Sequence, residues 1–164
     1  MKRGWWLFLL AATLFLADFF LKSYVSQNIP LMSHASPFYP YGGIPVFHHF
    51  CGISFSINHV LNRGAAWGMF ASFQEVLLYL RIVVISGLFI HVLFFNRDRF
   101  KDIPFVLIIT GAISNVVDYF VYGQVVDMFY FTFGSYSFPL FNIADSAIFS
   151  GVALLLLISL FKKN

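Results

Sequence analysis

The chain has 164 residues, of which 60% are hydrophobic and 10% charged, and its mean hydropathy is +0.82. Soluble domains carry about 25% charged residues, so this composition excludes a water-soluble globular domain and predicts one membrane-embedded domain over residues 1–164. The net charge of +3 does not indicate a nucleic-acid partner, because seven of the ten basic residues lie near the chain ends or in one short loop.

Four apolar runs are long enough to cross a bilayer as helices, which takes about 20 residues each. They cover residues 5–21, 75–95, 103–121 and 141–161. Basic residues precede the first run, separate the second from the third and follow the fourth, so the positive-inside rule predicts that both termini are cytoplasmic. The loops 22–74 and 122–140 are then predicted to lie outside.

The first run also has the features that begin a cleavable secretory signal peptide, because Lys2 and Arg3 precede an apolar stretch. This run is longer than a usual signal-peptide core. It carries Asp18 near its end, and no convincing small-x-small cleavage site is present. We therefore expect the run to be retained as a transmembrane helix.

The long outer loop changes character along its length. Residues 28–45 are rich in Pro, Gly, Ser and Tyr, which is typical of irregular structure. Over residues 51–59, apolar and small or polar side chains alternate, which predicts a strand with one buried face on the membrane surface. The aromatic, nearly uncharged run 65–73 predicts a helix that lies in the membrane interface.

Charged side chains at membrane depth are costly and are therefore candidates for a functional site. Five of the seven acidic residues lie in or near the spans: Asp18, Glu75, Asp118, Asp127 and Asp145. Because successive spans are antiparallel, most of these acids and two asparagines, Asn115 and Asn142, are expected at the level of the outer leaflet. Asn115 lies three residues before Asp118, and Asn142 three before Asp145, so each pair shares one helix face.

Two carboxylates close together in a low-dielectric site tend to share one proton, as in aspartic proteases. One carboxylate then acts as a base toward water, and the other as an acid toward the scissile carbonyl. The clustering alone does not exclude Asp118 from such a pair. A metal site is disfavoured because the five histidines have no ligand-like spacing with these acids, and a serine hydrolase because Ser146 has no plausible histidine base.

Two other protein classes remain open on the residues alone. A small proton-coupled transporter requires polar residues throughout the membrane thickness, whereas the inner halves of the spans are apolar apart from His91. In a non-enzymatic assembly protein, the acids would only bond neighbouring helices. Substituting Asp by Asn would then abolish folding rather than a reaction.

Five short motifs in a fixed order carry a family resemblance. They are Asp18-Phe-Phe-Leu-Lys22, Asn62-Arg-Gly-Ala-Ala-Trp-Gly68, Gly111-Ala-Ile-Ser-Asn-Val-Val-Asp118, Val125-Val-Asp127 and Phe141-Asn-Ile-Ala-Asp145-Ser146. On four spans of this orientation, they resemble the lipoprotein signal peptidase family, the bacterial signal peptidase II enzymes. The resemblance implies an all-α membrane protein of the bacterial cytoplasmic membrane, with four transmembrane helices, a small outer β-cradle and an interfacial helix.

The resemblance also implies an activity and its residues. The activity is that of a membrane aspartic endopeptidase, which removes signal peptides from diacylglyceryl-modified prolipoproteins by cleaving before the lipidated cysteine. Lipidated prolipoproteins and membrane lipid are the implied partners of a monomer that needs no cofactor or metal. Asp127 and Asp145 match the catalytic pair. The implied supporting and substrate-binding residues are Asp18, Lys22, Asn62, Gly64, Asn115, Asp118, Asn142 and Ala144.

Two positions depart from the family pattern. Ser114 stands where the family usually has Gly, and Tyr119 stands where it usually has Arg. That arginine would pair with lipid phosphate or a neighbouring acid, and Arg63 and Arg81 are the candidates to replace it here. Because the aspartate pair is intact, we expect a divergent but active enzyme.

Overall fold

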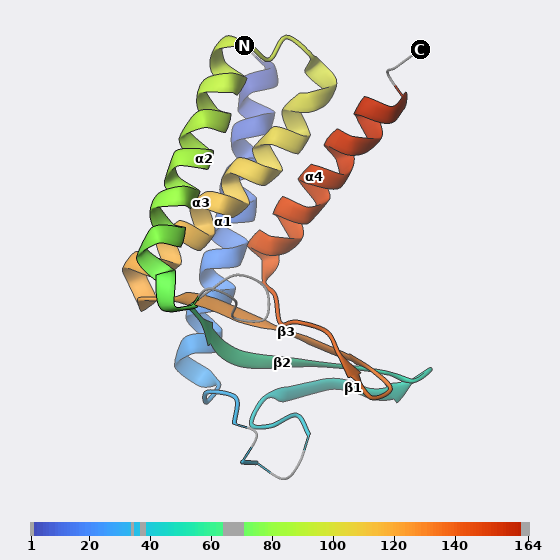
Figure 1. Ribbon diagram of the computed structural model, residues 1–164. Coiled ribbons are helices and arrows are strands. Elements are labelled where there is room, and N and C mark those ends of the chain that lie inside the picture. Colours follow the sequence, from blue (N-terminus) through green and yellow to red (C-terminus); the bar gives the residue numbers. More distant parts are fainter. Residues whose placement is uncertain (1, 34, 37–38, 64–70, 162–164) are drawn as a thin grey trace. The chain divides into compact units, whose positions relative to one another are not determined.

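The computed structural model describes residues 2–33, 35–36, 39–63 and 71–161. Within these residues, the α-helices are α1 (Lys2–Asn28), α2 (Gln74–Phe94), α3 (Asp102–Tyr122) and α4 (Ile143–Phe161) (Figure 1). The strands are β1 (Ile44–Phe50), β2 (Ile53–Asn62), β3 (Val125–Phe133) and β4 (Tyr136–Ser137), and two short 3-10 helices are η2 (Ala71–Phe73) and η3 (Arg99–Lys101).

The chain forms two compact units, which share α1 and α3. The helical unit comprises Met1–Asp18, Glu75–Val117 and Ile143–Asn164, and the sheet unit comprises Phe19–Gln74 and Asp118–Asn142. Each unit is therefore assembled from segments that are distant in the sequence.

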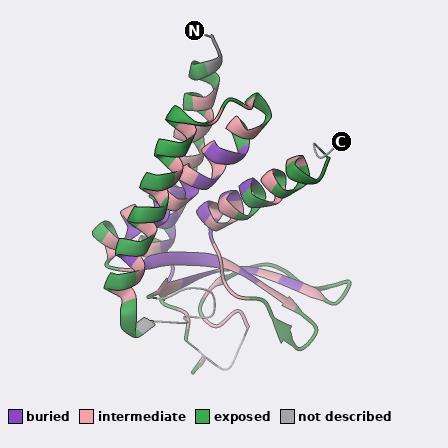
Figure 2. Ribbon diagram, turned by 45° about the horizontal axis from the view of Figure 1, so that its top comes forward, coloured by how far each residue is buried: buried purple, intermediate pink, exposed green. Residues whose placement is uncertain are grey.

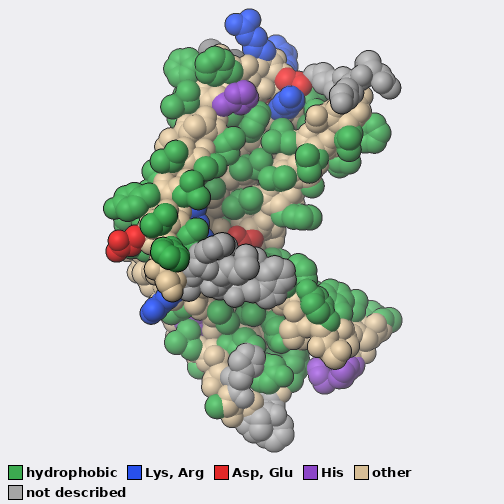
Figure 3. Space-filling view, in the orientation of Figure 1, with side chains coloured by type: hydrophobic (Ala, Val, Ile, Leu, Met, Phe, Trp, Pro, Cys, Tyr) green, Lys and Arg blue, Asp and Glu red, His purple; other side chains and the backbone are tan. Residues whose placement is uncertain are grey.

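The four α-helices are each long and apolar enough to span a membrane, as the sequence predicted. The apolar windows of α1, α2 and α4 are largely exposed, with only 6% of the window buried in each of α1 and α2 (Figure 2). Hydrophobic side chains likewise cover the visible face of the helical unit (Figure 3). Half of the apolar window of α3 is buried, against 17% in α4, so α3 is the helix around which the helical unit packs. This arrangement suits a protein whose helices face lipid rather than water.

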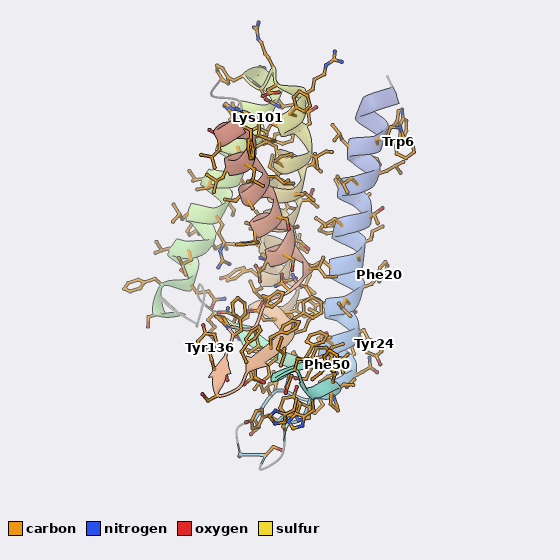
Figure 4. The ribbon with its side chains drawn as sticks, turned by 90° about the vertical axis from the view of Figure 1, so that its right-hand side faces the viewer. Trp6, Phe20, Tyr24, Phe50, Lys101 and Tyr136 are labelled. Atoms are coloured by element: carbon orange, nitrogen blue, oxygen red, sulfur yellow. The ribbon has the colours of Figure 1, made fainter. Side chains whose placement is uncertain are left out.

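One end of the helical unit gathers the start of α1, the connection from α2 to α3 and the end of α4 (Figure 1). Lys101 lies at this end, on the same connection as Arg97 and Arg99 (Figure 4). The basic residues predicted that these three segments lie on one side of the membrane. Their position at one end of this unit is consistent with that prediction.

Glycine brings α3 and α4 close together. A methyl group at Gly111 would lie 2.5 Å from the Ala144 carbonyl oxygen and 2.9 Å from Ile148 Cγ1. A methyl group at Gly151 would lie 2.6 Å from Ile108 Cγ1. Real Cβ atoms do not approach other atoms this closely, so the two backbones depend on glycine for their contact.

Replacing Gly111 by Ala is therefore expected to destabilise the protein by about 1–3 kcal/mol, the usual cost of overpacking. The backbone oxygen of Ala144 has no rotamer with which to avoid the new methyl group. Thermal unfolding in detergent measures this change. Gly87→Ala in α2 is the matched control, because no atom beyond the neighbouring backbone of its own helix lies within 4 Å of the added methyl position. Equal melting temperatures for the two variants would contradict the prediction.

The sheet unit contains an antiparallel sheet in the order β1-β2-β3-β4. Its buried core consists of Val25, Ile29, Val126 and Met128. The first two residues belong to α1 and the turn after it, so the core explains why α1 extends to Asn28. The predicted span ended at residue 21, and the outer loop therefore starts later than predicted.

The strand predicted over residues 51–59 is present as β2, but its buried face is the polar one. Ser54, Ser56 and Asn58 are buried, while Phe55 on the other face is only partly buried. Asn58 Nδ2 donates to the Pro40 carbonyl oxygen at 2.5 Å and Ser56 Oγ donates to Asn58 Oδ1 at 2.7 Å. The irregular segment before β1 thus supplies an acceptor for the buried amide of Asn58.

The opposite face of the sheet is aromatic. Phe55 stacks on Phe131 with ring centroids 4.3 Å apart, and Phe131 stacks in turn on Phe141 at 6.0 Å. Phe50 and Tyr136, near the ends of their hairpins, are exposed (Figure 4). Phe20 and Tyr24 are also exposed, and they project from α1 (Figure 4).

Several boundaries differ from the prediction. β1, β3 and β4 were not predicted from the residues, and β3 and β4 occupy the loop 122–140. The fourth span was expected to start at residue 141, but Phe141 accepts backbone hydrogen bonds from Met128 and Phe129 and α4 begins at Ile143. Residues 64–70 of the predicted interfacial helix lie outside the described residues, and residues 71–73 form η2.

Candidate active site

The candidate site residues and their hydrogen-bond partners form two clusters, one in each unit. The helical cluster contains Asp18, Ser114, Asn115, Ala144 and Asp145. The sheet cluster contains Lys22, Asn62, Asp118, Val126, Asp127 and Asn142. Gly64 lies outside the described residues.

In the helical cluster, Asp145 lies in the first turn of α4. Asn115 Nδ2 donates a hydrogen bond to Asp145 Oδ1 at 2.8 Å. The face of α3 that carries Asn115 therefore contacts the face of α4 that carries Asp145. Because an amide group both donates and accepts, Asn115 can bond this carboxyl group in its charged or its neutral form.

Asp18 is the last residue of α1 that belongs to the helical unit, and its side chain is fully buried. Its Oδ1 accepts a hydrogen bond from the backbone N–H of Ala144 at 3.0 Å, and its Oδ2 accepts one from Ser114 Oγ at 2.6 Å. The first N–H groups of a helix have no partner within the helix, and a negative charge there is favourable. Asp18 thus caps the start of α4 from another helix.

In the sheet cluster, Asp127 lies on β3 and is 2% exposed. Asn62 Nδ2 donates to Asp127 Oδ2 and Asn142 Nδ2 donates to Asp127 Oδ1, both at 2.9 Å. Asn142 also donates to the Val126 carbonyl oxygen at 3.2 Å. The pairing of β2 with β3 brings in Asn62, since it lies opposite Val125 in the sheet.

A buried ion pair supports the same strand. Lys22 Nζ lies 2.7 Å from Asp118 Oδ2, and both side chains are at most 2% exposed. Asp118 Oδ2 also accepts a hydrogen bond from the backbone N–H of Val126, the residue before Asp127. The charges of α1 and α3 therefore hold the backbone of β3 next to the candidate catalytic aspartate.

The structure thus brings most predicted residues together within one cluster or the other. Asp127 and Asp145 belong to different units, so their action as a pair stays a prediction.

Ser114 was noted in the sequence only as a departure from the family pattern, and the structure adds it to the site. The sequence feature that could have identified Ser114 is its hydroxyl group at membrane depth. Ser114 also lies one helical turn before Asp118, on the same face of the helix.

Four apolar helices, with one aspartate on α4 and one on β3 that each accept hydrogen bonds from asparagine amides, define a multi-pass membrane protein with candidate acid–base residues. A family model described as signal peptidase (SPase) II matches residues 10–161. A lipoprotein signal peptidase of Chlamydia pneumoniae is 41% identical over 111 residues, covering 66% of this chain and 66% of that relative. One of Syntrophus aciditrophicus is 35% identical, covering 100% of this chain and 98% of that relative.

A solved structure described as a bacterial membrane enzyme has a TM-score of 0.78 and 26% sequence identity, and the match covers 95% of this chain and 87% of that one. The chain belongs to the signal peptidase II family. This family consists of aspartic proteases that cleave signal peptides from prolipoproteins. The resemblance carried by the five motifs is confirmed.

Proposed function

We propose that this protein removes the signal peptide from diacylglyceryl-modified prolipoproteins by cleaving before the lipidated cysteine, with Asp127 and Asp145 as the catalytic pair. One observation carries the assignment of the pair. Each of these two aspartates accepts a hydrogen bond from the amide of at least one asparagine of the matched motifs. Amides hold a carboxyl group in place without neutralising it, which acid–base chemistry requires.

In the proposed reaction, the two carboxyl groups share one proton. The charged carboxylate takes a proton from a water molecule, whose oxygen attacks the carbonyl carbon of the scissile peptide bond. The neutral carboxyl group gives its proton to the carbonyl oxygen. The tetrahedral intermediate then collapses: the C–N bond breaks, and the leaving amine takes the proton that came from water. One hydroxyl group of the intermediate returns its proton to the carboxylate that had protonated the carbonyl oxygen, so the pair again shares one proton.

The supporting residues have separable proposed roles. Asn62 and Asn142 orient Asp127, and Asn115 orients Asp145. The pair Lys22–Asp118 holds the backbone of β3, and Asp18 holds α4 through the N–H of Ala144. For Gly64, we propose a role in binding the substrate, on the family motif alone.

The proposed topology places both termini in the cytoplasm and the catalytic pair near the outer face of the cytoplasmic membrane. The basic residues near the chain ends and between α2 and α3 support this orientation. The acyl chains of the substrate would then enter laterally from the outer leaflet. We also propose a monomer and an interfacial helix within residues 65–73.

A cleavage assay with two matched substrates tests this function. The purified protein is mixed in detergent with a diacylglyceryl-modified prolipoprotein, and with the same polypeptide carrying Ser in place of the lipidated cysteine. We expect a gel shift that reports loss of the signal peptide from the lipidated substrate only. Equal cleavage of both would refute the requirement for lipid, and cleavage of neither would refute the activity.

Two further measurements, proton transport into proteoliposomes and the folding of the Asp→Asn variants, separate the proposed enzyme from the two other classes. A proton-coupled transporter would acidify the lumen of proteoliposomes without releasing any peptide. An assembly protein would lose its fold when Asp127 or Asp145 is replaced by Asn. An enzyme loses cleavage and keeps its fold.

A further inference from the structure

Ser114 makes a contact that the family pattern does not provide. The family usually has Gly at this position, and Gly has no side chain with which to bond a carboxylate. Here the Ser114 hydroxyl is buried and donates to Asp18 Oδ2 at 2.6 Å. A hydrogen bond of this length to a charged oxygen is among the stronger kinds found in proteins.

We propose that Ser114 is a positioning residue that fixes the first turn of α4, and with it Asp145, by way of Asp18. This inference rests on the proposed role of Asp145 in catalysis. It adds a residue to the site and concerns a position at which this chain differs from the usual family pattern.

The two oxygens of Asp18 have different partners in the helical cluster. Oδ1 accepts from the Ala144 N–H and Oδ2 accepts from Ser114. The hydroxyl group therefore restrains rotation of the carboxylate about its last bond. That rotation would carry Oδ1 away from the N–H of α4, so the bond at one oxygen preserves the bond at the other.

Two consecutive residues of α3 are thereby linked by hydrogen bonds to two consecutive residues of α4. Ser114 acts on Ala144 through Asp18, and Asn115 bonds Asp145 directly. Small displacements of a reacting group are costly, because catalysis depends on orientation to a fraction of an ångström. A looser Ala144 is expected to slow the chemical step without weakening substrate binding.

Four variants test the proposal by steady-state kinetics on the lipidated substrate. We expect Ser114→Ala and Ser114→Gly to lower kcat by about tenfold, on the order of one buried hydrogen bond to a charged group, with KM unchanged. Ser114→Thr keeps the hydroxyl and is expected to restore kcat to within about threefold of the parent. Thr110→Val removes a buried hydroxyl one turn earlier in α3, leaves the bond to Asp18 in place and should leave kcat unchanged.

The outcomes are separable. A purely structural role predicts that kcat per folded molecule is the same in all four variants, and that result would overturn the proposal. So would a rise in KM with kcat retained, or a Thr variant no better than Ala. Should the Ala variant fail to fold, Gly and Thr carry the comparison, since kcat of the Thr variant is expected to exceed that of the Gly variant by at least about threefold.

Asp145→Asn is assayed in parallel to distinguish two failures. If it abolishes cleavage while Ser114→Ala has no effect, the positioning role is wrong and the proposed function stands. If Asp145→Asn cleaves at the normal rate, the catalytic pair is wrong, and the inference on Ser114 falls with it.

Discussion

Asp127→Asn and Asp145→Asn are each expected to lower the rate of prolipoprotein cleavage by on the order of 10³-fold to 10⁴-fold, the contribution of general acid–base catalysis. In each variant, the amide that replaces the carboxyl group can neither accept a proton from water nor give one to the scissile carbonyl, so one of the two proton transfers is lost. The measurement is single-turnover cleavage of lipidated substrate, which isolates the chemical step from product release.

The fold is expected to survive these substitutions. In Asp127→Asn, the new amide nitrogen can face Asn62, whose amide presents its oxygen after rotating by half a turn. Asn142 is less free, because it also bonds the Val126 carbonyl. In Asp145→Asn, rotation of the Asn115 amide has the same effect. The melting temperature of each variant should therefore stay close to that of the parent, although its cleavage rate falls.

Asp102→Asn is the matched control. Asn96 Nδ2 donates to Asp102 Oδ1 at 2.9 Å, so this aspartate has the same kind of partner as the catalytic pair. It lies at the start of α3, outside both clusters, and its substitution should leave cleavage intact. If either catalytic variant cleaved as fast as Asp102→Asn, the assignment of the pair would be wrong.

Lys22→Met is expected to be the most destabilising single change, at about 3–5 kcal/mol, because it leaves the buried Asp118 without its charge partner. The same carboxylate bonds the Val126 N–H, so the strand that carries Asp127 is expected to shift as well. Thermal unfolding in detergent measures the loss, and Lys101→Met in η3 is the control.

A double variant separates the buried charge from the lost contacts. Lys22→Met with Asp118→Asn removes both charges and keeps an oxygen for the Val126 N–H. It should recover most of the stability that Lys22→Met loses, because replacing both members of a buried pair is often close to neutral. A double variant no more stable than the single one would show that the lost contacts of the lysine side chain, rather than the unpaired charge, account for the destabilisation.

The sequence predicted the helices well because a membrane span needs only length and apolarity. Spans predicted at 75–95, 103–121 and 141–161 agree with α2, α3 and α4 to within two residues at each end. The exception is the end of α1, which continues for seven residues beyond the prediction. Those residues are partly polar, and they are helical because Val25 packs in the core of the sheet unit.

The strands were harder to predict because their pattern depends on their neighbours. Apart from Asp127 and Thr132, β3 (Val125–Phe133) is apolar on both faces and does not alternate, so its period gives no strand signal. β2 alternates as predicted, but its polar face is buried by contacts with residues far away in the chain. Asn58, for example, bonds Pro40, eighteen residues earlier.

The aspartates on which the site depends could be found from the sequence alone. A carboxyl group at membrane depth is expensive, and its motif can be matched to a family position by position. The partners of each aspartate could not be found in this way. Asp18 bonds residues 96 and 126 positions away, Asn62 bonds an aspartate 65 positions away, and no local pattern records such distances.

Ser114 illustrates the difference between what local sequence patterns determine and what only tertiary contacts determine. The sequence by itself determined a membrane protein of four spans, its family and its two candidate catalytic aspartates, because hydropathy and short motifs are local properties. Only the tertiary structure decided which side chains hold those aspartates. Hydrogen-bond geometry depends on how separate helices and strands meet, and a serine that the motif records only as a departure becomes, in the fold, a donor to Asp18.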